Sequence, residues 1–544
     1  MGDTRADGKT ATGSYDVVVV GAGFSGLFML HKLRGLGFSV RVYEAGEGVG
    51  GTWYWNRYPG ARVDIESQEY SYSFDEALEL EWEWTERYAS QPELLRYINH
   101  VADRFDLRRD IQLGTKVTSA IFDETANRWT VTTGHGDRVT AKFCVMATGC
   151  LSVPKEPDLP GLSQFKGKVY RTSRWPHEGV DFTGQKVAII GTGSSAIQSI
   201  PQIAKQAAHL TVFQRTPNFS LPAHNGPVNQ EVVQDWKANR ETYREQQRNA
   251  GFASVMIKDT DVTALSVSDD EREATYEKNW AVGGFSLLGA YADLISDKTA
   301  NDTASEFVRN KIRSVVKDPA VAEKLMPHNH PIVTKRPCVD IGYFETYNRD
   351  NVTLVDLPAT PIEEITATGV RTTAKEYPAD SLVLAIGFDA MTGALSSMDI
   401  RGRNGLGLKD KWLGGPRTYL GLMIAGFPNM FIVTGPGSPS VLTNMMVSIE
   451  QHVNWIADCI SYLSDRQVGA IEATEDAENG WVQHVNEVAD TTLYPLANSW
   501  YMGANVPGKP RVFMPYIGGF GVYRQKCIEI AANGYEGFAL THSP

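Results

Sequence analysis

A glycine-rich turn between an apolar strand-like segment and a helix-like segment occurs twice, and this duplication constrains the fold more than any other feature. The turns are Gly21-Ala-Gly23-Phe-Ser-Gly26 and Gly191-Thr-Gly193-Ser-Ser-Ala196. The preceding strands are expected at residues 15–20 and 186–190, and the following helices at 24–35 and 194–208. In such turns the first glycine permits the tight bend, the second lets the backbone approach a pyrophosphate, and the third position lets helix pack on strand. The pattern predicts an α/β fold with two Rossmann-like dinucleotide-binding domains.

The residue 23 positions beyond each first glycine distinguishes the two nucleotides. After the first turn it is Glu44, at the end of a strand-like segment, where a carboxylate accepts hydrogen bonds from a ribose diol. After the second turn it is Gln214, and Arg215 follows at once, where a guanidinium suits a 2′-phosphate. The sequence therefore predicts FAD in the first unit and NADPH in the second. Two ordinary βα turns with a solvated Arg215 are the alternative interpretation.

Length and charge limit the class of protein. A chain of 544 residues predicts two or three domains. The net charge of −12, without a long basic tract, argues against nucleic acid as a partner. No apolar run reaches the ~18 residues that cross a bilayer, and residues 1–14 are polar without a secretory signal. We expect a monomeric cytoplasmic protein without a membrane partner, preceded by a disordered tail at residues 1–14.

The cysteines bear on metals and redox chemistry. There are five of them, widely spread, and no two form a C-x-x-C pair: Cys144, Cys150, Cys338, Cys459 and Cys527. Cysteines spread in this way are typical of a reducing compartment. They form no closely spaced metal-binding motif, so no metal is expected. It also argues against a flavin disulfide reductase, which needs a redox-active cysteine pair.

Shifts in composition divide the chain. A proline-rich connector at 154–160 and the turn after a strand-like segment at 381–386 mark two domain crossings. Charged, helix-like segments at 230–249, 267–280, 305–316 and 320–324 mark an insertion. We therefore expect residues 15–150 and 386–544 to form the FAD-binding domain, 151–224 and 331–385 the NADPH-binding domain, and 225–330 a helical insertion in the second.

Several short segments carry a resemblance that extends from about residue 15 to about residue 540. They are Gly51-Thr-Trp-Tyr-Trp-Asn-Arg-Tyr-Pro-Gly60-Ala-Arg-Val-Asp64, residues 165–176, Val212-Phe-Gln-Arg-Thr-Pro217, Thr334-Lys335-Arg336, Ala385-Ile-Gly-Phe-Asp389 and the region around Trp500. Together they resemble the type I Baeyer–Villiger monooxygenases, including phenylacetone, steroid and cyclohexanone monooxygenases. The resemblance implies an FAD-containing, NADPH- and O₂-dependent enzyme that converts hydrophobic ketones to esters or lactones.

The chain departs from the family pattern at two positions. The family signature is F-x-G-x-x-x-H-x-x-x-W-P, and this chain has Arg171 at the position of the histidine. An arginine can replace a donor but not a neutral acceptor, which bears on how tightly NADPH use is coupled to oxygenation. The second departure is Ile386, where the family usually has threonine.

The resemblance assigns the catalytic roles. It implies that a C4a-peroxyflavin attacks the ketone and forms a Criegee intermediate, with Arg336 as the fixed cation that keeps the peroxide deprotonated. It implies that Asp64 holds this guanidinium bidentately. The alternatives are a structural ion pair for Arg336 and a helix or turn cap for Asp64.

The resemblance also assigns binding residues. For FAD it adds residues of the segment 51–64, which we call the tryptophan-rich segment: Gly51, Thr52, Trp53 and Asp64. For NADPH it adds the second turn and a clamp on the 2′-phosphate: Thr192, Ser194, Ser195, Arg215, Thr216, Lys335 and Trp500. Core packing is the alternative for Trp500. For the substrate it indicates an apolar wall, with most of it on a loop at 437–446: Leu151, Val441, Leu442 and Met445.

Three other functions stay open at the level of sequence. An N- or S-oxidising flavin monooxygenase shares the fold, but is expected to lack the Lys335-Arg336 pair and the tryptophan-rich segment. An uncoupled NADPH oxidase is made plausible by Arg171. A nucleotide-sensing regulatory protein would keep both glycine-rich turns, but would have no reason to carry Asp64 and Arg336 together.

Overall fold

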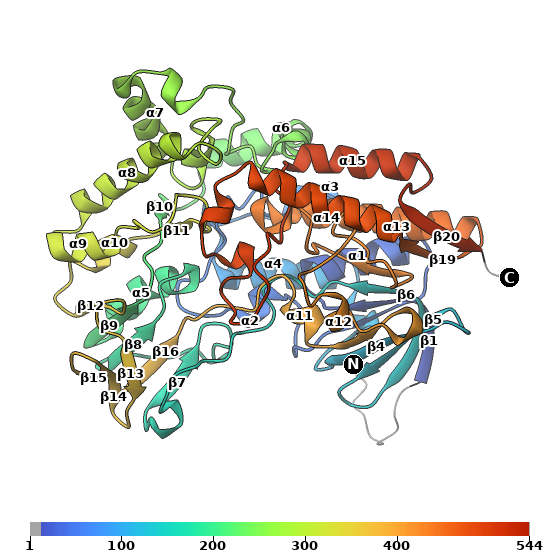
Figure 1. Cartoon of the computed structure of the whole chain (residues 1–544), viewed down its shortest axis with the longest axis horizontal. Helices are drawn as coiled ribbons and strands as arrows, with labels where there is room; N and C mark the ends of the chain where they lie inside the picture. Colours follow the sequence, from blue (N-terminus) through green and yellow to red (C-terminus); the bar gives the residue numbers. More distant parts are fainter. Residues whose placement is uncertain (1–11, 543–544) are drawn as a thin grey trace.

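The first lobe is built on a mixed sheet. The computed structural model describes residues 12–542, and its two main sheets lie in separate lobes (Figure 1). The larger sheet has eight strands in the order β17-β4-β5-β6-β1-β2-β3, with β18 also paired to β6. Their bounds are β1 Thr12–Val20, β2 Val40–Tyr43, β3 Ile111–Gln112, β4 Val117–Asp123, β5 Arg128–Thr133, β6 Arg138–Met146, β17 Asp399–Arg401 and β18 Met430–Ile432. Because β17 and β18 join this sheet, the chain returns to the first lobe after residue 386.

The second lobe is built on a five-stranded parallel sheet in the order β12-β9-β8-β16-β7. Its strands are β7 Lys168–Arg171, β8 Lys186–Ile190, β9 His209–Gln214, β12 Val352–Asp356 and β16 Ser381–Leu384. The central strands β8 and β16 are almost fully buried, as expected of a parallel sheet covered on both faces. Smaller sheets pair β10 Ser220–Pro222 with β11 Cys338–Asp340, β13 Ile362–Ile365 with β14 Gly369–Thr372 and β15 Glu376–Pro378, and β19 Val468–Ala473 with β20 Phe538–His542.

Helices cover both sheets. In the first lobe, α1 Phe24–Gly35 is buried on most sides because it lies between the sheet and α13 Met445–Asp465. In the second, α5 Ser194–Gln206 follows the second glycine-rich turn. The remaining helices outside the insertion are α2 Thr52–Trp55, α3 Glu76–Glu81, α4 Gln91–Arg104, α10 Tyr343–Thr346, α11 Gly393–Ser396, α12 Leu408–Lys411, α14 Glu475–Asp490 and α15 Phe520–Ala532.

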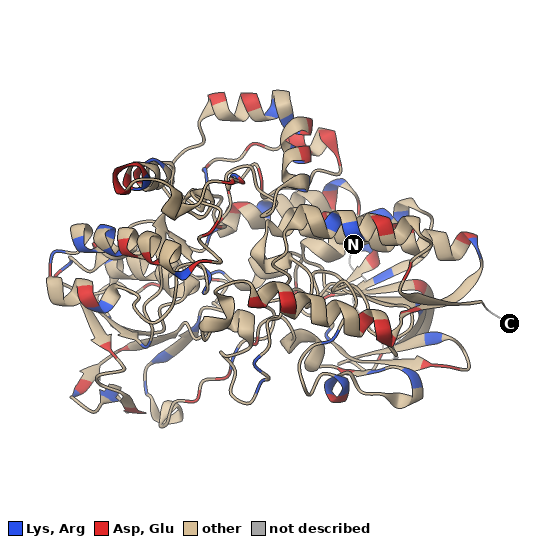
Figure 2. Ribbon diagram, turned by 45° about the horizontal axis from the view of Figure 1, so that its top comes forward, with Lys and Arg blue, Asp and Glu red and all other residues tan. Residues whose placement is uncertain are grey.

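The insertion is helical, with the parallel pair β10 and β11 at its two ends. Its helices are α6 Gln230–Asn249, α7 Asp269–Val282, α8 Lys298–Val315 and α9 Pro319–Leu325. Each is preceded by a residue whose side chain caps it: Asn229, Ser268, Asp297 and Asp318. Figure 1 shows α7, α8 and α9 on the outer side of the second lobe. Figure 2 shows acidic and basic residues interspersed along these outer helices, as expected for solvated faces.

Some expected boundaries shift. Strand β1 begins at Thr12, because residues 12–14 pair with residues 138–140 of β6, so the expected tail was wrong for these three residues. Residues 1–11 of that tail lie outside the described part of the chain. Helix α8 begins at Lys298 rather than 305, because Asp297 provides an N-terminal cap that the periodicity did not reveal. Between residues 12 and 542, no helix combines the length and the apolar character that crossing a membrane requires.

A buried ion pair ties the insertion to the first lobe. The guanidinium of Arg244 on α6 donates from Nε (2.8 Å) and Nη2 (2.5 Å) to Glu79 on α3, and the two side chains are 5% and 8% exposed. Further bonds run from Arg244 to Ser71 and Gln247. Charges removed from water require such pairing, because either partner left alone keeps the full cost of its burial.

We predict that Glu79→Gln lowers the free energy of unfolding by about 3 kcal/mol, because the Arg244 guanidinium stays buried without its counter-charge. Equilibrium unfolding in urea measures this loss. The matched control is Asp302→Asn, which breaks an exposed pair with Lys298 at 2.6 Å on α8. It is expected to cost less than about 0.5 kcal/mol. Equal losses in the two variants would contradict a structural role for the buried pair.

Candidate active site

The first and third glycines of the first glycine-rich turn have no space for a side chain. Gly21 has a φ of +107°, and a Cβ on it would lie 2.4 Å from the Ala147 carbonyl oxygen. A Cβ on Gly26 would lie 1.8 Å from the Gly21 oxygen. Gly23 faces Gly51 of the tryptophan-rich segment, since a Cβ on Gly23 would lie 3.4 Å from the Cα of Gly51. The two bare backbones form the kind of cradle that a dinucleotide pyrophosphate requires.

Glu44 lies where the first nucleotide would need an acceptor. Its carboxylate is buried and accepts the backbone N–H of Ala22 at 2.8 Å and of Gly46 at 2.7 Å. Burial raises its pKa, and these backbone hydrogen bonds oppose the rise. A carboxylate has about four acceptor positions, so both oxygens keep lone pairs for a ribose diol. The first lobe therefore fits FAD.

The second turn repeats this arrangement. Gly191 has a φ of +113°, and a Cβ on it would meet the Ala385 oxygen at 2.3 Å, whereas the space beside Gly193 is open. The hydroxyl of Thr192 donates to the Thr216 carbonyl at 2.9 Å. The hydroxyls of the first residues of α5 are also engaged: Ser194 with Cys338 Sγ (3.2 Å) and Ser195 with Thr172 (3.1 Å).

The residues expected to select NADPH lie at the carboxyl edge of the second sheet. Gln214 is buried and donates to the Lys324 carbonyl at 2.6 Å, so Arg215, which is exposed, is the residue available to a ligand. Burial lowers the pKa of Lys335, and the charge of Arg215 lowers it further. Two cations close enough to repel one another favour a dianion between them. The second lobe therefore fits NADPH.

Arg336 and Asp64 meet where the two lobes contact each other. Nε of Arg336 donates to Oδ2 of Asp64 at 3.3 Å, and Nη1 donates to the Val441 carbonyl at 3.0 Å. The expected bidentate grip was wrong, because within residues 12–542 a single hydrogen bond joins the two side chains. Burial alone would lower the pKa of Arg336, but the charge of Asp64 and the contact with Tyr501 outweigh burial and raise it. Arg336 is therefore a permanent cation.

Asp64 is held by residues of both lobes. Burial raises the pKa of its carboxyl, and Arg336 opposes the rise. A weaker hydrogen bond of 3.4 Å comes from Gln198 of α5, which also accepts the hydroxyl of Tyr58 at 2.9 Å. Gly60, with a φ of +83°, lies so close to α5 that a Cβ would meet the Gln198 carbonyl oxygen at 2.3 Å. The tryptophan-rich segment thus docks directly on the helix of the second turn.

Two aromatic residues, Tyr501 and Phe285, contact the guanidinium of Arg336. Tyr501 is buried, and burial raises its pKa to about 12 against the opposing charge of Arg336. The ring of Phe285, from the insertion, lies 5.4 Å from the guanidinium carbon. Trp500 is partly buried, with its ring centroid 4.2 Å from that of Tyr501. Trp53 is a core residue that donates to the Tyr70 hydroxyl at 3.2 Å, whereas its neighbour Thr52 is exposed.

The expected apolar wall belongs to the core of the first lobe. Leu151, Leu442 and Met445 are partly buried against it, and Val441 is buried within it. Val441 and Leu442 lie on the 3-10 helix Ser440–Leu442. Met445 is the first residue of α13 rather than a loop residue, because Asn444 caps that helix. The wall is therefore more regular than the glycine-rich sequence at 437–446 indicated.

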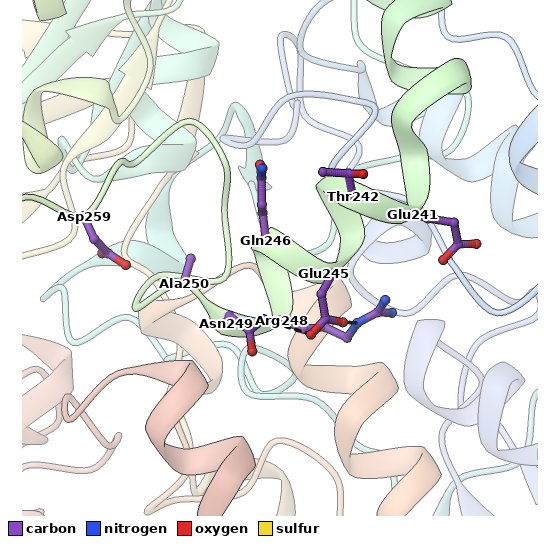
Figure 3. Close-up of a pocket in the computed structure, with 8 residues that line it drawn as sticks. All are labelled: Glu241, Thr242, Glu245, Gln246, Arg248, Asn249, Ala250 and Asp259. Atoms are coloured by element: carbon purple, nitrogen blue, oxygen red, sulfur yellow. Dashed lines mark hydrogen bonds and ion pairs between the residues drawn. The ribbon is translucent and has the colours of Figure 1, made fainter.

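Two surface depressions lie apart from this site. One, of ≈ 780 Å³, is open to solvent and lined by eight polar or small residues at the end of α6: Glu241, Thr242, Glu245, Gln246, Arg248, Asn249, Ala250 and Asp259 (Figure 3). The other, of ≈ 430 Å³, involves α6, α13 and α15. None of the expected site residues lines either one. Glu245 pairs with Arg248 at 3.0 Å (Figure 3), and no arrangement there resembles a dinucleotide cradle.

Comparisons with known proteins agree with this geometry. Residues 18–286 match the family model described as pyridine nucleotide-disulphide oxidoreductase. A phenazine N-monooxygenase of Lysobacter antibioticus is 44% identical over 534 residues, or 97% of this chain and 98% of the relative. A Baeyer–Villiger monooxygenase of Pseudooceanicola batsensis is 43% identical over 531 residues, or 97% and 96%. A solved structure of oxidized steroid monooxygenase bound to NADP is 54% identical with a TM-score of 0.94, covering 97% of this chain and 100% of the other.

The chain belongs to the Baeyer–Villiger monooxygenase family. All five of its cysteines are free and buried, so the match to the disulphide oxidoreductase model reflects the fold. Within this family member, sequence reasoning missed three residues of the site: Gln198, Phe285 and Tyr501. Tyr501 could have been found as the neighbour of Trp500, but nothing local marks Gln198 or Phe285, because each reaches the site from another domain.

A buried carboxyl of this Baeyer–Villiger monooxygenase lies five residues beyond Asp64. Glu69 Oε2 accepts from Gln247 (3.0 Å) and from the Val255 N–H (3.2 Å), while Oε1 has no hydrogen-bond partner within residues 12–542. Its backbone carbonyl accepts from Asn444, the cap of α13. Burial raises the pKa of Glu69 from 4.5 to about 7.

We predict that Glu69→Gln changes how stability depends on pH. A raised pKa means that the folded protein binds this proton more tightly than the unfolded chain does, so stability from Glu69 is present below about pH 4.5 and is lost as the pH rises to about 7. The variant should lack this loss, which is on the order of 3 kcal/mol. Thermal unfolding at pH 5 and pH 8 measures it. The exposed Glu273→Gln serves as the control, and a Glu69→Gln profile parallel to wild type would contradict the assignment.

Proposed function

We propose that the protein is an FAD-containing, NADPH- and O₂-dependent monooxygenase that converts hydrophobic ketones to esters or lactones. The observation that carries the proposal is the Arg336–Asp64 pair, with an Nε–Oδ2 distance of 3.3 Å. It lies where the tryptophan-rich segment meets α5, and its guanidinium also contacts the carbonyl of Val441 in the apolar wall. The names of the relatives support the same reaction, and the steroid monooxygenase structure bound to NADP supports the identity of the second nucleotide.

The two nucleotides are assigned to domains according to the two main sheets. In our proposal residues 15–150 and 386–544 bind FAD, with Gly21, Gly23 and Gly51 at the pyrophosphate and Glu44 at the ribose. Residues 151–224 and 331–385 bind NADPH. The membership of β17 and β18 in the first sheet, and of β7, β12 and β16 in the second, supports these bounds. The five buried free cysteines support a reducing compartment, which is the cytoplasm.

The residues of the chain supply charge and shape. The chemistry that the flavin supplies when bound is acceptance of a hydride from NADPH and activation of O₂. Arg336 supplies a cation that does not titrate in the working range, and it stabilises negative charge on oxygen when a ketone carbonyl is attacked. Asp64 and the Val441 carbonyl fix the guanidinium through hydrogen bonds, and Tyr501 contacts it. Because the pKa of Tyr501 is about 12, its hydroxyl stays neutral and does not compete as an anion for the guanidinium.

A second candidate reaction is N-oxidation of an aromatic heterocycle. The observation that favours it is the 44% identical relative named as a phenazine N-monooxygenase, which matches 97% of this chain. Incubation with NADPH, O₂ and a panel of linear, cyclic and aromatic ketones beside phenazine-like heterocycles, with products identified by mass spectrometry, separates the two. Esters or lactones support the proposed function, and N-oxides alone would overturn it.

We predict that Arg336→Ala still consumes NADPH but loses ketone oxygenation by about 10²–10³-fold, because only the oxygenation step needs the fixed cation. The hydrogen peroxide released should rise to account for the NADPH consumed. Product yield and peroxide are measured in the same reaction. Arg109→Ala, at an exposed arginine of the first lobe, is the matched control. A normal yield of ester from Arg336→Ala would refute the role.

We also predict that Arg215→Ala raises the KM for NADPH by about tenfold or more and leaves the KM for NADH within about twofold. The reason is that the lost charge-assisted bonds go only to the 2′-phosphate, which NADH lacks. Steady-state kinetics with both nucleotides measure the difference. Equal effects on the two would exclude Arg215 from the phosphate site.

A further inference from the structure

The carboxyl edge of the second sheet gathers residues from four adjacent parallel strands. Arg215 follows β9, Gly191 follows β8, Ala385 follows β16, and Arg171 is the last residue of β7. Ligands of open parallel sheets bind outside this edge. Any further segment that crosses the edge is therefore placed beside the bound nucleotide.

The connector between the two lobes makes such a crossing. The backbone N–H of Lys155 donates to the Gly387 carbonyl at 3.1 Å, and the N–H of Asp389 donates to the Val153 carbonyl at 2.9 Å. An isolated antiparallel bridge between Pro154 and Phe388 lies between these two bonds. The connector is thus fastened as a short ribbon to the chain that leaves β16.

A side-chain clamp fastens the next residue of the connector. Both terminal nitrogens of Arg171 donate to Glu156, from Nη1 to Oε1 at 3.1 Å and from Nη2 to Oε2 at 2.9 Å. The hydrogen bonds and the charge of Arg171 lower the pKa of Glu156. Two parallel bonds of this kind fix orientation as well as distance, and a histidine in the same position could not make them. The departure at Arg171 is thus matched by a partner in the connector.

Lys155 lies between these two attachments and shares the electrostatic surroundings of Arg215. Burial lowers the pKa of Lys155, the charge of Arg215 lowers it further, and Asp389 opposes the change. Arg215 has the same lowering effect on Lys335. Asp389 is engaged by the ammonium of Lys509, which lies 2.6 Å from its Oδ1. Within the described part of the chain, no side-chain hydrogen bond or ion pair engages the charged groups of Lys155, Arg215 or Lys335.

We propose that Lys155 is a third cation of the 2′-phosphate site of NADPH, and that Glu156 and Arg171 are positioning residues that hold it there. The inference rests on the proposed roles of Arg215 and Lys335. Three unpaired cations from three different segments suit a phosphate dianion, which carries a charge of about −1.5 to −2 at neutral pH. Each cation can donate to a different phosphate oxygen.

The test measures nucleotide binding to the flavin-loaded protein rather than turnover. Isothermal titration calorimetry with 2′,5′-ADP and with ADP gives two dissociation constants, and only the first ligand carries a 2′-phosphate. Lys155→Gln is expected to weaken 2′,5′-ADP about tenfold and ADP less than twofold. The matched control is Lys168→Gln, at an exposed lysine at the amino end of β7, and it should change neither constant.

The positioning role of Glu156 and Arg171 is tested by combining their variants with Lys155→Gln. Glu156→Gln and Arg171→Gln should each weaken 2′,5′-ADP about threefold, and neither should weaken it further once Lys155→Gln is present. Arg171→Lys should not restore binding, because an ammonium cannot make the two parallel bonds. Full additivity with Lys155→Gln would overturn the positioning role.

Two outcomes overturn the assignment of Lys155. One is an equal loss for both ligands, which would place the lysine at the diphosphate or in the general structure. The other is no loss for either. Arg215→Gln is measured in parallel. If Arg215→Gln loses the preference for 2′,5′-ADP over ADP while Lys155→Gln keeps it, only the assignment of Lys155 is refuted. If neither variant loses selectivity, the proposed 2′-phosphate site fails as well. Ketone oxygenation, followed by product, is a separate readout in every case.

Discussion

The close contact between Gly60 and α5 is the constraint on which the rest of the site depends. A Cβ at Gly60 would lie 2.3 Å from the Gln198 carbonyl oxygen, so a larger residue would push the tryptophan-rich segment away from the second lobe. Asp64 lies four residues further along this segment, and Arg336 belongs to the chain that returns to the second lobe. The ion pair therefore forms only when the lobes are docked, and the cation is fixed only when both nucleotide units are in place.

The two clusters of cations differ in what balances them. Arg336 has a carboxylate, a carbonyl and a tyrosine around it, so its charge is oriented before any ligand arrives. Among residues 12–542, no side-chain hydrogen bond or ion pair engages the cations at the edge of the second sheet. Burial, together with the charge of Arg215, lowers the pKa of Lys155 and of Lys335. The first arrangement suits a group that stabilises charge during a reaction. The second suits a group that binds and releases a dianion.

Local signals in the sequence predicted the elements, and contacts between domains are what they missed. The bounds of α1, α6 and β8 agree with the expected ranges, because capping residues, glycine turns and periodicity act over a few residues. The chemistry of Asp64 and Arg336 came from resemblance, and the structure brings the two together. The hydrogen bond from Arg336 to the Val441 carbonyl, the contacts of Gln198 and the place of Lys155 could not be predicted. Each depends on how one domain sits against another, and no local pattern encodes that.

The insertion is part of the site and not only a covering for the second lobe. Phe285 comes from it, and the centroid of its ring lies 5.4 Å from the guanidinium carbon of Arg336. The same insertion is tied to the first lobe through Arg244 and Glu79, and the loop after α6 contacts Glu69 and the cap of α13. The insertion therefore contacts both Arg336 and the helix that carries Met445. A change in its attachment would therefore move Phe285 and the first turn of α13 together.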